Sequence, residues 1–331
     1  MAIELKNLDI EDLEICSKAF DNENDSHAKL GLVDFYGVLY PDGTDQKPIW
    51  FIRHCNPDRI RFGGIMEPSD DILGLQTPLH LEDLAQKEDL MIPYGRIDEN
   101  CFGISCAEPF FEYRYYADHA TLKEANAFDL YAEYYPKTIY KHADHSTFIS
   151  QITQPCELSG IYEGKEVRGL GNFELCYFPQ NEVRDLNDYA AYIYSYCSGI
   201  RKDGRRELMM VYIDLSGKGT GYYWLQGEEP VFSEKVEMET EWYRLPYMDD
   251  GTCTYKNAVF RFAGKEIHFI GKWGYMGLTA YPRIELGGQS QNMGIFYEGD
   301  EPYEHEISIT FNENMQVTAE NLAKLGFEVK E

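Results

Sequence analysis

The sequence predicts an all-β protein of antiparallel strands, and three observations support this fold class. Short apolar or alternating segments bounded by Gly, Pro, Asn and Asp recur at intervals of about 10–15 residues. Aromatic residues are abundant, with 26 Tyr, 18 Phe and 4 Trp among 331 residues, and such side chains favour sheet surfaces. Helical periodicity is too scarce to supply the crossover helices of a parallel sheet. Strands of this kind form either barrels or two-sheet sandwiches of the jelly-roll or lectin type.

The N-terminal part combines a short helix with a hairpin. Apolar side chains recur near helical spacing over residues 9–20, and Asp9 is the expected N-cap of that helix. Two strands at 30–40 and 49–55 flank a Pro-Asp-Gly turn, in which Pro presets φ and Gly allows positive φ. A second short helix is expected at 81–86.

Residues 236–242 give the clearest strand signal in the second half. Val, Met, Thr and Trp alternate strictly with three Glu in this segment, which is typical of a half-buried antiparallel strand with one solvated face. A last short helix is predicted at 319–325, after the N-cap Thr318 and before Gly326. Further strands are predicted at 110–116, 128–135, 208–214, 259–262, 267–273, 293–297 and 307–311.

One internal repeat is visible. Residues 164–173 recur as 264–273: a Gly-Lys turn begins a strand, a Gly follows seven residues on, and an aromatic residue comes two places after it. Hairpins share turn chemistry, so the match has two explanations, common turn chemistry or a duplication. A duplication would imply two similar β-modules with a boundary between Gly171 and Asn187.

Charge and composition exclude several function classes. The 57 acidic and 30 basic side chains give a net charge of −27, which repels phosphate and argues against nucleic-acid or anionic-membrane partners. No apolar run approaches the ~18 residues of a membrane span, and the N-terminus lacks the features of a signal peptide. A cytoplasmic protein with no membrane insertion is therefore expected. The eight cysteines lack any C-x-x-C pair, which favours reduced and mostly buried thiols.

The Gly-x-x-x-Gly-Lys hairpin of residues 160–171 resembles the central signature of the carotenoid hydratase and AttH-like family, which also includes kievitone hydratase and fungal Diels–Alderases. The comparable end of the second half is Gly294 to Glu298. The resemblance implies two packed antiparallel lipocalin-like β-barrels, here residues 1–180 and 181–331, with a cavity for an apolar ligand and no cofactor. The family's Tyr-x-Asp has a counterpart in Tyr212 and Asp214. Its His-x-Trp is replaced by Leu175-Cys176-Tyr177.

Two strands carry the candidate catalytic residues Asp214, Tyr212, Glu174 and Tyr177. Residues i and i+2 of a strand share a face, so Tyr212 and Asp214 lie with Leu208 and Met210. A carboxylate on an apolar face has its pKa raised and becomes a competent general acid. The alternative is that Asp214 starts a turn. Glu174 follows the hairpin where the family places its acidic residue; alternatively, it faces solvent.

Ligand-binding and metal-binding residues are predicted less directly. Trp224, Trp273, Met210 and His119 are candidate ligand contacts, because aromatic side chains stack flat ligands. His142 and His145 are weak metal candidates that would need His119 or Asp118 as a further ligand. The alternative for the histidine segment is a polar surface loop, and no metal is expected.

These observations predict a cofactor-independent lyase or isomerase, hydratase-like or cyclase-like, that acts on an apolar or polyphenolic small molecule. Acid–base catalysis in a β-barrel cavity would move the protons. Two alternatives remain: a non-catalytic binding protein for a hydrophobic ligand, and a carbohydrate-binding β-sandwich. The expected partner is an apolar or aromatic small molecule, and a homo-oligomer stays open.

Overall fold

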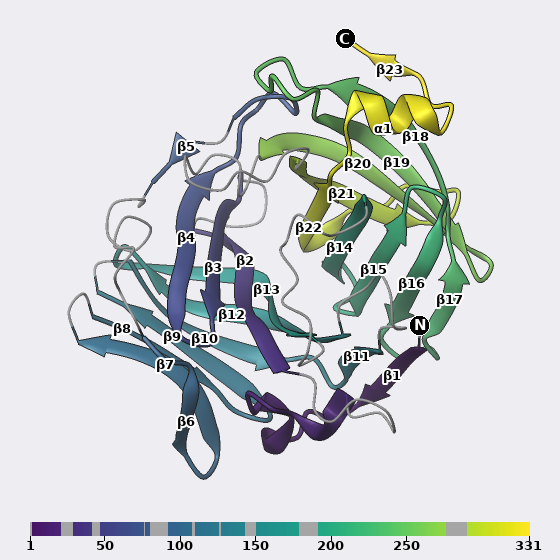
Figure 1. Ribbon diagram of the computed structural model, residues 1–331. Coiled ribbons are helices and arrows are strands. Elements are labelled where there is room, and N and C mark those ends of the chain that lie inside the picture. Colours follow the sequence, from purple (N-terminus) through teal and green to yellow (C-terminus); the bar gives the residue numbers. More distant parts are fainter. Residues whose placement is uncertain are drawn as a thin grey trace. The chain divides into compact units, whose positions relative to one another are not determined.

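The computed structural model describes residues 2–20, 29–41, 47–75, 77–79, 92–107, 110–125, 127–142, 150–178, 191–275 and 290–331. The chain divides into two compact units. The N-terminal unit comprises Ala2–Glu67 and Pro78–Val183, and the C-terminal unit comprises Met1, Pro68–Thr77 and Arg184–Glu331. Each unit contains one large, strongly curved sheet (Figure 1).

The sheet of the N-terminal unit runs in the order β5-β4-β3-β2-β13-β12-β10-β9-β8-β7-β6, and β11 joins β1 to β12. Two 3-10 helices, η1 (Ile10–Leu13) and η2 (Lys18–Phe20), follow β1. The strands are β1 (Ala2–Lys6), β2 (Lys29–Tyr40), β3 (Ile49–Asn56), β4 (Arg59–Glu67), β5 (Thr77–Pro78), β6 (Gly95–Asp98), β7 (Cys101–Ala107), β8 (Phe110–Tyr115), β9 (His119–Glu124), β10 (Phe128–Tyr134), β11 (Thr138–His142), β12 (Ser150–Tyr162) and β13 (Lys165–Phe178).

The sheet of the C-terminal unit runs in the order β17-β16-β15-β14-β22-β21-β20-β19-β18-β23. Its one helix among the described residues is α1 (Ala319–Lys324). The strands are β14 (Tyr192–Arg201), β15 (Arg206–Asp214), β16 (Lys218–Leu225), β17 (Val231–Lys235), β18 (Glu237–Arg244), β19 (Cys253–Phe262), β20 (Lys265–Tyr275), β21 (Ser290–Glu298), β22 (His305–Met315) and β23 (Val329–Lys330).

The two sheets share one topology. Successive long strands pair antiparallel, and the first long strand closes against the last, β2 against β13 and β14 against β22. This confirms the predicted all-β fold with one barrel-like antiparallel sheet per half. The sandwich alternative is wrong, because the described strands of each unit belong to one continuous sheet rather than to two facing ones.

One face of each sheet forms a hydrophobic core. On β13, Phe173, Leu175 and Tyr177 belong to the core of the N-terminal unit, together with apolar residues of β2, β3 and β7–β12. The core of the C-terminal unit is built around residues such as Met209, Tyr255 and Phe269. Because side chains alternate along a strand, the remaining residues of these strands lie on the opposite face.

The repeated Gly-Lys motif forms two hairpin turns of the same geometry. Glu163 and Gly164 between β12 and β13 have φ of 48° and 78°, and Ala263 and Gly264 between β19 and β20 have 49° and 77°. Two successive positive φ values define the type I′ turn that suits two-residue hairpins. By topology, however, β12–β13 corresponds to β21–β22. The repeated sequence therefore reflects a turn type common to both hairpins. The architecture that the two units share is the order of their strands.

Of the three predicted helices, one is wrong as a single element, one is confirmed and one lies outside the described residues. The helix expected over 9–20 is wrong as one element: Asp9 does cap, accepting from Glu11 N at 3.0 Å, but η1 ends at Leu13 and η2 begins only at Lys18. The helix at 319–325 is confirmed, with Thr318 Oγ1 accepting from Asn321 N and Gly326 at φ 82°. The helix expected at 81–86 lies outside the described residues. No helix in the described part of the chain is long and apolar enough to cross a bilayer.

A short segment from the N-terminal half, Pro68–Thr77, belongs to the C-terminal unit. Ser69 and Gly274 exchange two backbone hydrogen bonds of 2.9 Å. A Cβ at Gly271 would lie 2.0 Å from Ile72 Cδ1 and 2.4 Å from the Lys256 carbonyl oxygen. Glycine at position 271 therefore allows Ile72 to lie directly on β20.

Candidate functional site

The face of the N-terminal sheet opposite the hydrophobic core carries a buried polar cluster. We call it the Glu174 cluster and define it as Tyr36, Lys141, Gln151, Asn172 and Glu174, which lie on β2, β11, β12 and β13. All five are buried, with exposed fractions of 5% or less. Register places them together, because Asn172 is opposite Tyr36, Gln151 is opposite Cys176 and Lys141 is opposite Gln151.

The carboxylate of Glu174 accepts three hydrogen bonds. Tyr36 OH donates to Oε1 at 2.8 Å, Asn172 Nδ2 to Oε1 at 2.5 Å, and Gln151 Nε2 to Oε2 at 2.8 Å. Asn172 Nδ2 also donates to Tyr36 OH at 2.8 Å. A carboxylate surrounded by donors is held in one position, which is a requirement for a positioned reactive or binding group.

These contacts fix which way the two amides face. An ionised carboxylate only accepts, so the nitrogens of Gln151 and Asn172 must point at Glu174 and their oxygens away from it. Both oxygens, Gln151 Oε1 and Asn172 Oδ1, are buried and have no hydrogen-bond partner among the described residues. Buried polar atoms are rarely left unpaired. The cluster thus contains two buried carbonyl acceptors without a described partner.

Lys141 supplies a titratable group beside this carboxylate. Its side chain is 1% exposed, and burial lowers the pKa of the ammonium to about 8, against the opposing effect of Cys176 and Glu174. An amine with this pKa exists in both protonation states at neutral pH, as a general acid or base requires. Strongly shifted groups of this kind are candidates for functional sites.

A second pair lies next to the cluster on the same face. Asp34 is opposite both Glu174 on β13 and His54 on β3. The Nδ1 atom of His54 lies 2.6 Å from Asp34 Oδ1. Two acidic side chains, a histidine and a lysine therefore share one region of this sheet face.

In the C-terminal unit, the predicted Tyr212 lies in an aromatic cluster. Its ring stacks on Tyr192 at 4.8 Å and lies 5.9 Å from Tyr194. Tyr212 is opposite Tyr194, and Met210 is opposite Tyr196, so both predicted residues share the face opposite the core. Both are buried.

Asp214, at the end of β15, is engaged in a turn. Its Oδ1 accepts from Ser216 N at 2.7 Å, Ser216 Oγ at 2.6 Å and Lys218 N at 3.1 Å. These are the contacts of a turn-forming aspartate. Its role as a general acid stays a prediction, and no described contact joins it to Glu174.

The other predicted residues are spread over the molecule. Tyr177 lies on the core face of β13 and donates to the backbone oxygens of Asp12 at 2.7 Å and Glu14 at 3.1 Å, so it secures η1. Trp224 on β16 and Trp273 on β20 are separated in the sheet by four strands. The two tryptophans therefore do not lie on neighbouring strands.

The histidines are also apart. His119 stacks between Tyr116 at 4.2 Å and Tyr131 at 5.3 Å, with Asp118 Oδ1 at 2.7 Å. His142 contacts Phe20 edge-on and lies 3.5 Å from Glu4. His145 lies outside the described residues. Within the described ranges, no three His, Cys, Asp or Glu side chains are grouped to hold a metal ion.

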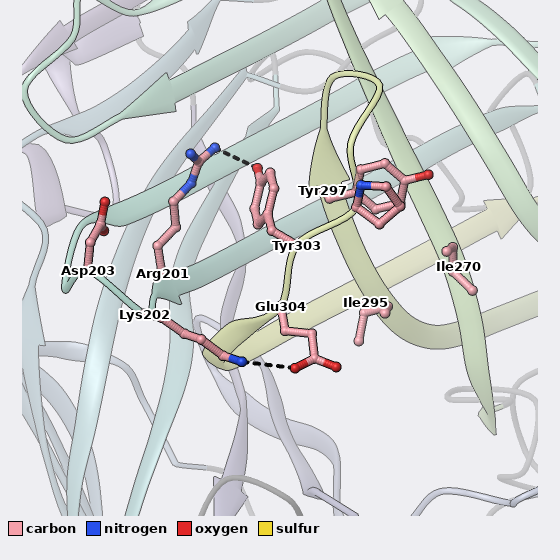
Figure 2. A pocket seen from close by; sticks show the side chains of 9 residues that line it. Arg201, Lys202, Asp203, Ile270, Ile295, Tyr297, Tyr303 and Glu304 are labelled. Atoms are coloured by element: carbon pink, nitrogen blue, oxygen red, sulfur yellow. Dashed lines mark hydrogen bonds and ion pairs between the residues drawn. The ribbon is translucent and has the colours of Figure 1, made fainter.

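A pocket of about 800 Å³ opens in the C-terminal unit (Figure 2). Ile270 and Ile295, paired across β20 and β21, line one part of it, and Tyr303 and Arg201 line another. Lys202 and Glu304, 3.0 Å apart, form an exposed ion pair at its edge. A pocket of this size is large enough for a small organic ligand.

Beside the pocket, Glu207 is the centre of a closed polar network. The carboxylate is fully buried and accepts from Arg201 at 2.6 and 2.9 Å, from Tyr223 and Tyr303 at 2.6 Å, and from His305 Nε2 at 2.8 Å. Burial alone would raise the pKa of Glu207, but these donors outweigh it and lower the pKa to about 2. Glu207 is therefore ionised at all ordinary pH values and cannot donate a proton.

Several solved structures are similar to this chain. A protein assigned as AttH from Nitrosomonas europaea matches with a TM-score of 0.47 at 12% identity, over 87% of this chain and 93% of its own. Kievitone hydratase from Nectria haematococca matches with a TM-score of 0.45 at 9% identity, over 95% and 96%. CghA matches with a TM-score of 0.47 at 12% identity, over 96% and 98%. No family model and no curated protein sequence matches the chain.

Glu174 is a site candidate in the sequence, whereas its neighbours in the cluster are not. Lys141 stands in Thr138-Ile139-Tyr140-Lys141-His142, where period-2 alternation puts it on the face of Ile139 rather than in solvent. This alternation is the signal in the sequence that could have identified Lys141 as buried. No such signal exists for Tyr36 and Gln151, because only the register of β2, β13 and β12 brings them to the carboxylate.

Proposed function

We propose that this protein is a lyase or isomerase that moves protons on an apolar small molecule at the Glu174 cluster. The observation that carries the proposal is the buried Lys141, whose pKa of about 8 lies close to neutrality beside a fixed carboxylate. In this reaction class the protein has to move protons while the substrate's own bonds rearrange, and the cluster contains groups that can do so.

The roles follow from the atoms present. The neutral amine of Lys141 takes a proton from a carbon next to the reacting centre, and the resulting ammonium returns it, either to a departing hydroxyl that leaves as water or to another carbon. The nearby Glu174 carboxylate favours the charged form of the Lys141 amine. The buried oxygens of Gln151 and Asn172, which point away from Glu174, accept hydrogen bonds from substrate donors and orient the molecule.

Native mass spectrometry of the purified protein identifies a co-purified ligand. The conversion of that compound is then the activity to be measured. Lys141→Met should then lower turnover by about 10²–10⁴-fold, the usual contribution of one positioned acid–base group. In the wild type, turnover should change with an apparent pKa near 8. Lys137→Met, at an exposed position four residues away, is the matched control and should have no effect.

Stability separates loss of chemistry from loss of folding. A lysine whose folded pKa is below its unfolded value destabilises the protein at pH below about 8, and this penalty disappears as pH rises towards 10.5. Lys141→Met should therefore be more stable than the wild type at pH 7 and still be inactive. A stable variant with unchanged turnover would contradict the proposal.

The alternative of a non-catalytic ligand-binding protein is favoured by one observation, the pocket of about 800 Å³ beside Ile270 and Ile295 (Figure 2). In that case, Ile295→Glu should abolish binding of the co-purified ligand, whereas Lys141→Met should leave it intact. The opposite pattern supports catalysis at the Glu174 cluster.

A further inference from the structure

The C-terminal unit contains a second carboxylate that, like Glu174, accepts hydrogen bonds from a tyrosine and a glutamine. Glu313 on β22 accepts from Tyr192 OH through Oε1 at 2.6 Å and from Gln291 Nε2 through Oε2 at 2.8 Å. Glu174 likewise accepts from Tyr36 on one carboxylate oxygen and from Gln151 on the other, both at 2.8 Å.

The two sets occupy corresponding strands. In each unit the tyrosine lies on the first long strand, the glutamate on the last, and the glutamine on the strand before the last. Glu313 is opposite Tyr194, away from the hydrophobic core, just as Glu174 lies away from its own core. One arrangement of three side chains thus recurs on two sheets of common topology, although no sequence motif links the two copies.

Gln291 has a second property that points to a ligand. Its side chain is 2% exposed, and Oε1 is buried with no hydrogen-bond partner among the described residues. Because Nε2 faces the Glu313 carboxylate, the atom left without a partner is the carbonyl oxygen. A buried acceptor of this kind needs a donor from another molecule.

We propose that Gln291, Glu313 and Tyr192 form a binding site for a phenolic hydroxyl group. The hydroxyl donates its hydrogen bond to Gln291 Oε1 or to the Glu313 carboxylate. Aromatic neighbours favour a ring as its carrier, since Tyr192 stacks on Tyr212, and Tyr194 lies 6.2 Å from Phe311. Tyr192 and Glu313 are partly exposed, so this side of the site borders solvent. Binding here does not depend on the chemistry proposed for Lys141.

Two matched probes test the site: resorcinol, which has two hydroxyl donors, and 1,3-dimethoxybenzene, which has the same ring and no donor. The readout is the side-chain amide NMR signal of Gln291, assigned by its loss in Gln291→Met. Resorcinol should shift this signal in a saturable way, and the dimethyl ether should not. Glu313→Gln should weaken resorcinol binding about tenfold or more, because it removes the charged acceptor and frees the orientation of Gln291.

Two controls make the outcome specific. Glu301→Gln, at an exposed position of the same unit, and Lys141→Met should both leave the resorcinol titration unchanged. Equal shifts with both probes, no shift with resorcinol up to its solubility limit, or an unchanged affinity in Glu313→Gln would each overturn the proposal. None of these results bears on turnover by Lys141, so the two proposals fail separately.

Discussion

Replacement of Glu207 should lower stability strongly. Four side chains donate to it in the interior of the C-terminal unit, and removing its charge leaves the Arg201 guanidinium without its counter-ion. Glu207→Gln should therefore lower the free energy of unfolding by about 3–5 kcal/mol, measured by urea titration at pH 7. Glu304→Gln, which breaks the exposed pair with Lys202, is the control and should cause no measurable change.

The same residue determines part of the acid sensitivity. A carboxyl whose folded pKa lies at about 2, below its usual 4.5, contributes stability above pH 4.5 and loses it as pH falls towards 2. The difference corresponds to about 3 kcal/mol. The wild type should lose this increment between pH 4.5 and 2, and Glu207→Gln should not. Parallel pH curves for the two proteins would contradict this assignment.

At the scale of single residues, the sequence can mark a side chain as a site candidate only when neighbours on its own strand distinguish it. Glu174 is a candidate in the sequence because the family resemblance places an acidic residue after the glycine hairpin. Glu207 and Glu313 cannot be recognised in this way, because their hydrogen-bond partners lie 6 to 121 positions away along the chain. Only the pairing of the strands brings these partners to the two carboxylates. In a chain with 57 acidic residues, a functional carboxylate differs from a solvated one by its donors, and the donors come from other strands.

At the level of elements, the β-turn at Ala263 offers a direct test of the hairpin interpretation. Ala263 has φ of 49°, in the left-handed region that costs an ordinary L-residue about 1–2 kcal/mol. Asparagine tolerates this region and is the preferred first residue of a type I′ turn before glycine. Ala263→Asn should therefore raise the free energy of unfolding by about 0.5–1 kcal/mol in urea titrations. Ala263→Val should lower it, and the reverse order of the two variants would contradict the assigned turn.

Strands and turns were predictable because their signals are local. The Val236–Trp242 alternation appears directly as exposed Glu237, Glu239 and Glu241 and a buried Trp242 on β18. Residues 9–20 show the limit of local signals. Their spacing fits a helix, yet Tyr94 OH bonds to the Leu13 carbonyl oxygen at 2.8 Å and Leu30 N bonds to the Ile15 carbonyl oxygen at 2.8 Å. These tertiary contacts take the carbonyl groups that a continued helix would have used.

For the whole molecule, the dominant feature is its charge of −27. The described ion pairs involve only some of the acidic side chains, so like-charge repulsion between the others opposes the compact state. Added salt screens this repulsion, since the Debye length falls from about 30 Å at 0.01 M to about 8 Å at 0.15 M.

The thermal midpoint at pH 7 should therefore rise when NaCl increases from about 0.01 M to about 0.15 M. The control is the same pair of measurements near pH 4.6, where the net charge is close to zero and screening has no net repulsion to relieve. Calorimetry at the two pH values checks both statements. A salt-independent midpoint at pH 7 would mean that local ion pairs, such as that between Arg53 and Glu124 at 2.5 Å, already offset the long-range repulsion. An equal rise at both pH values would point to a general salt effect on apolar burial rather than to charge.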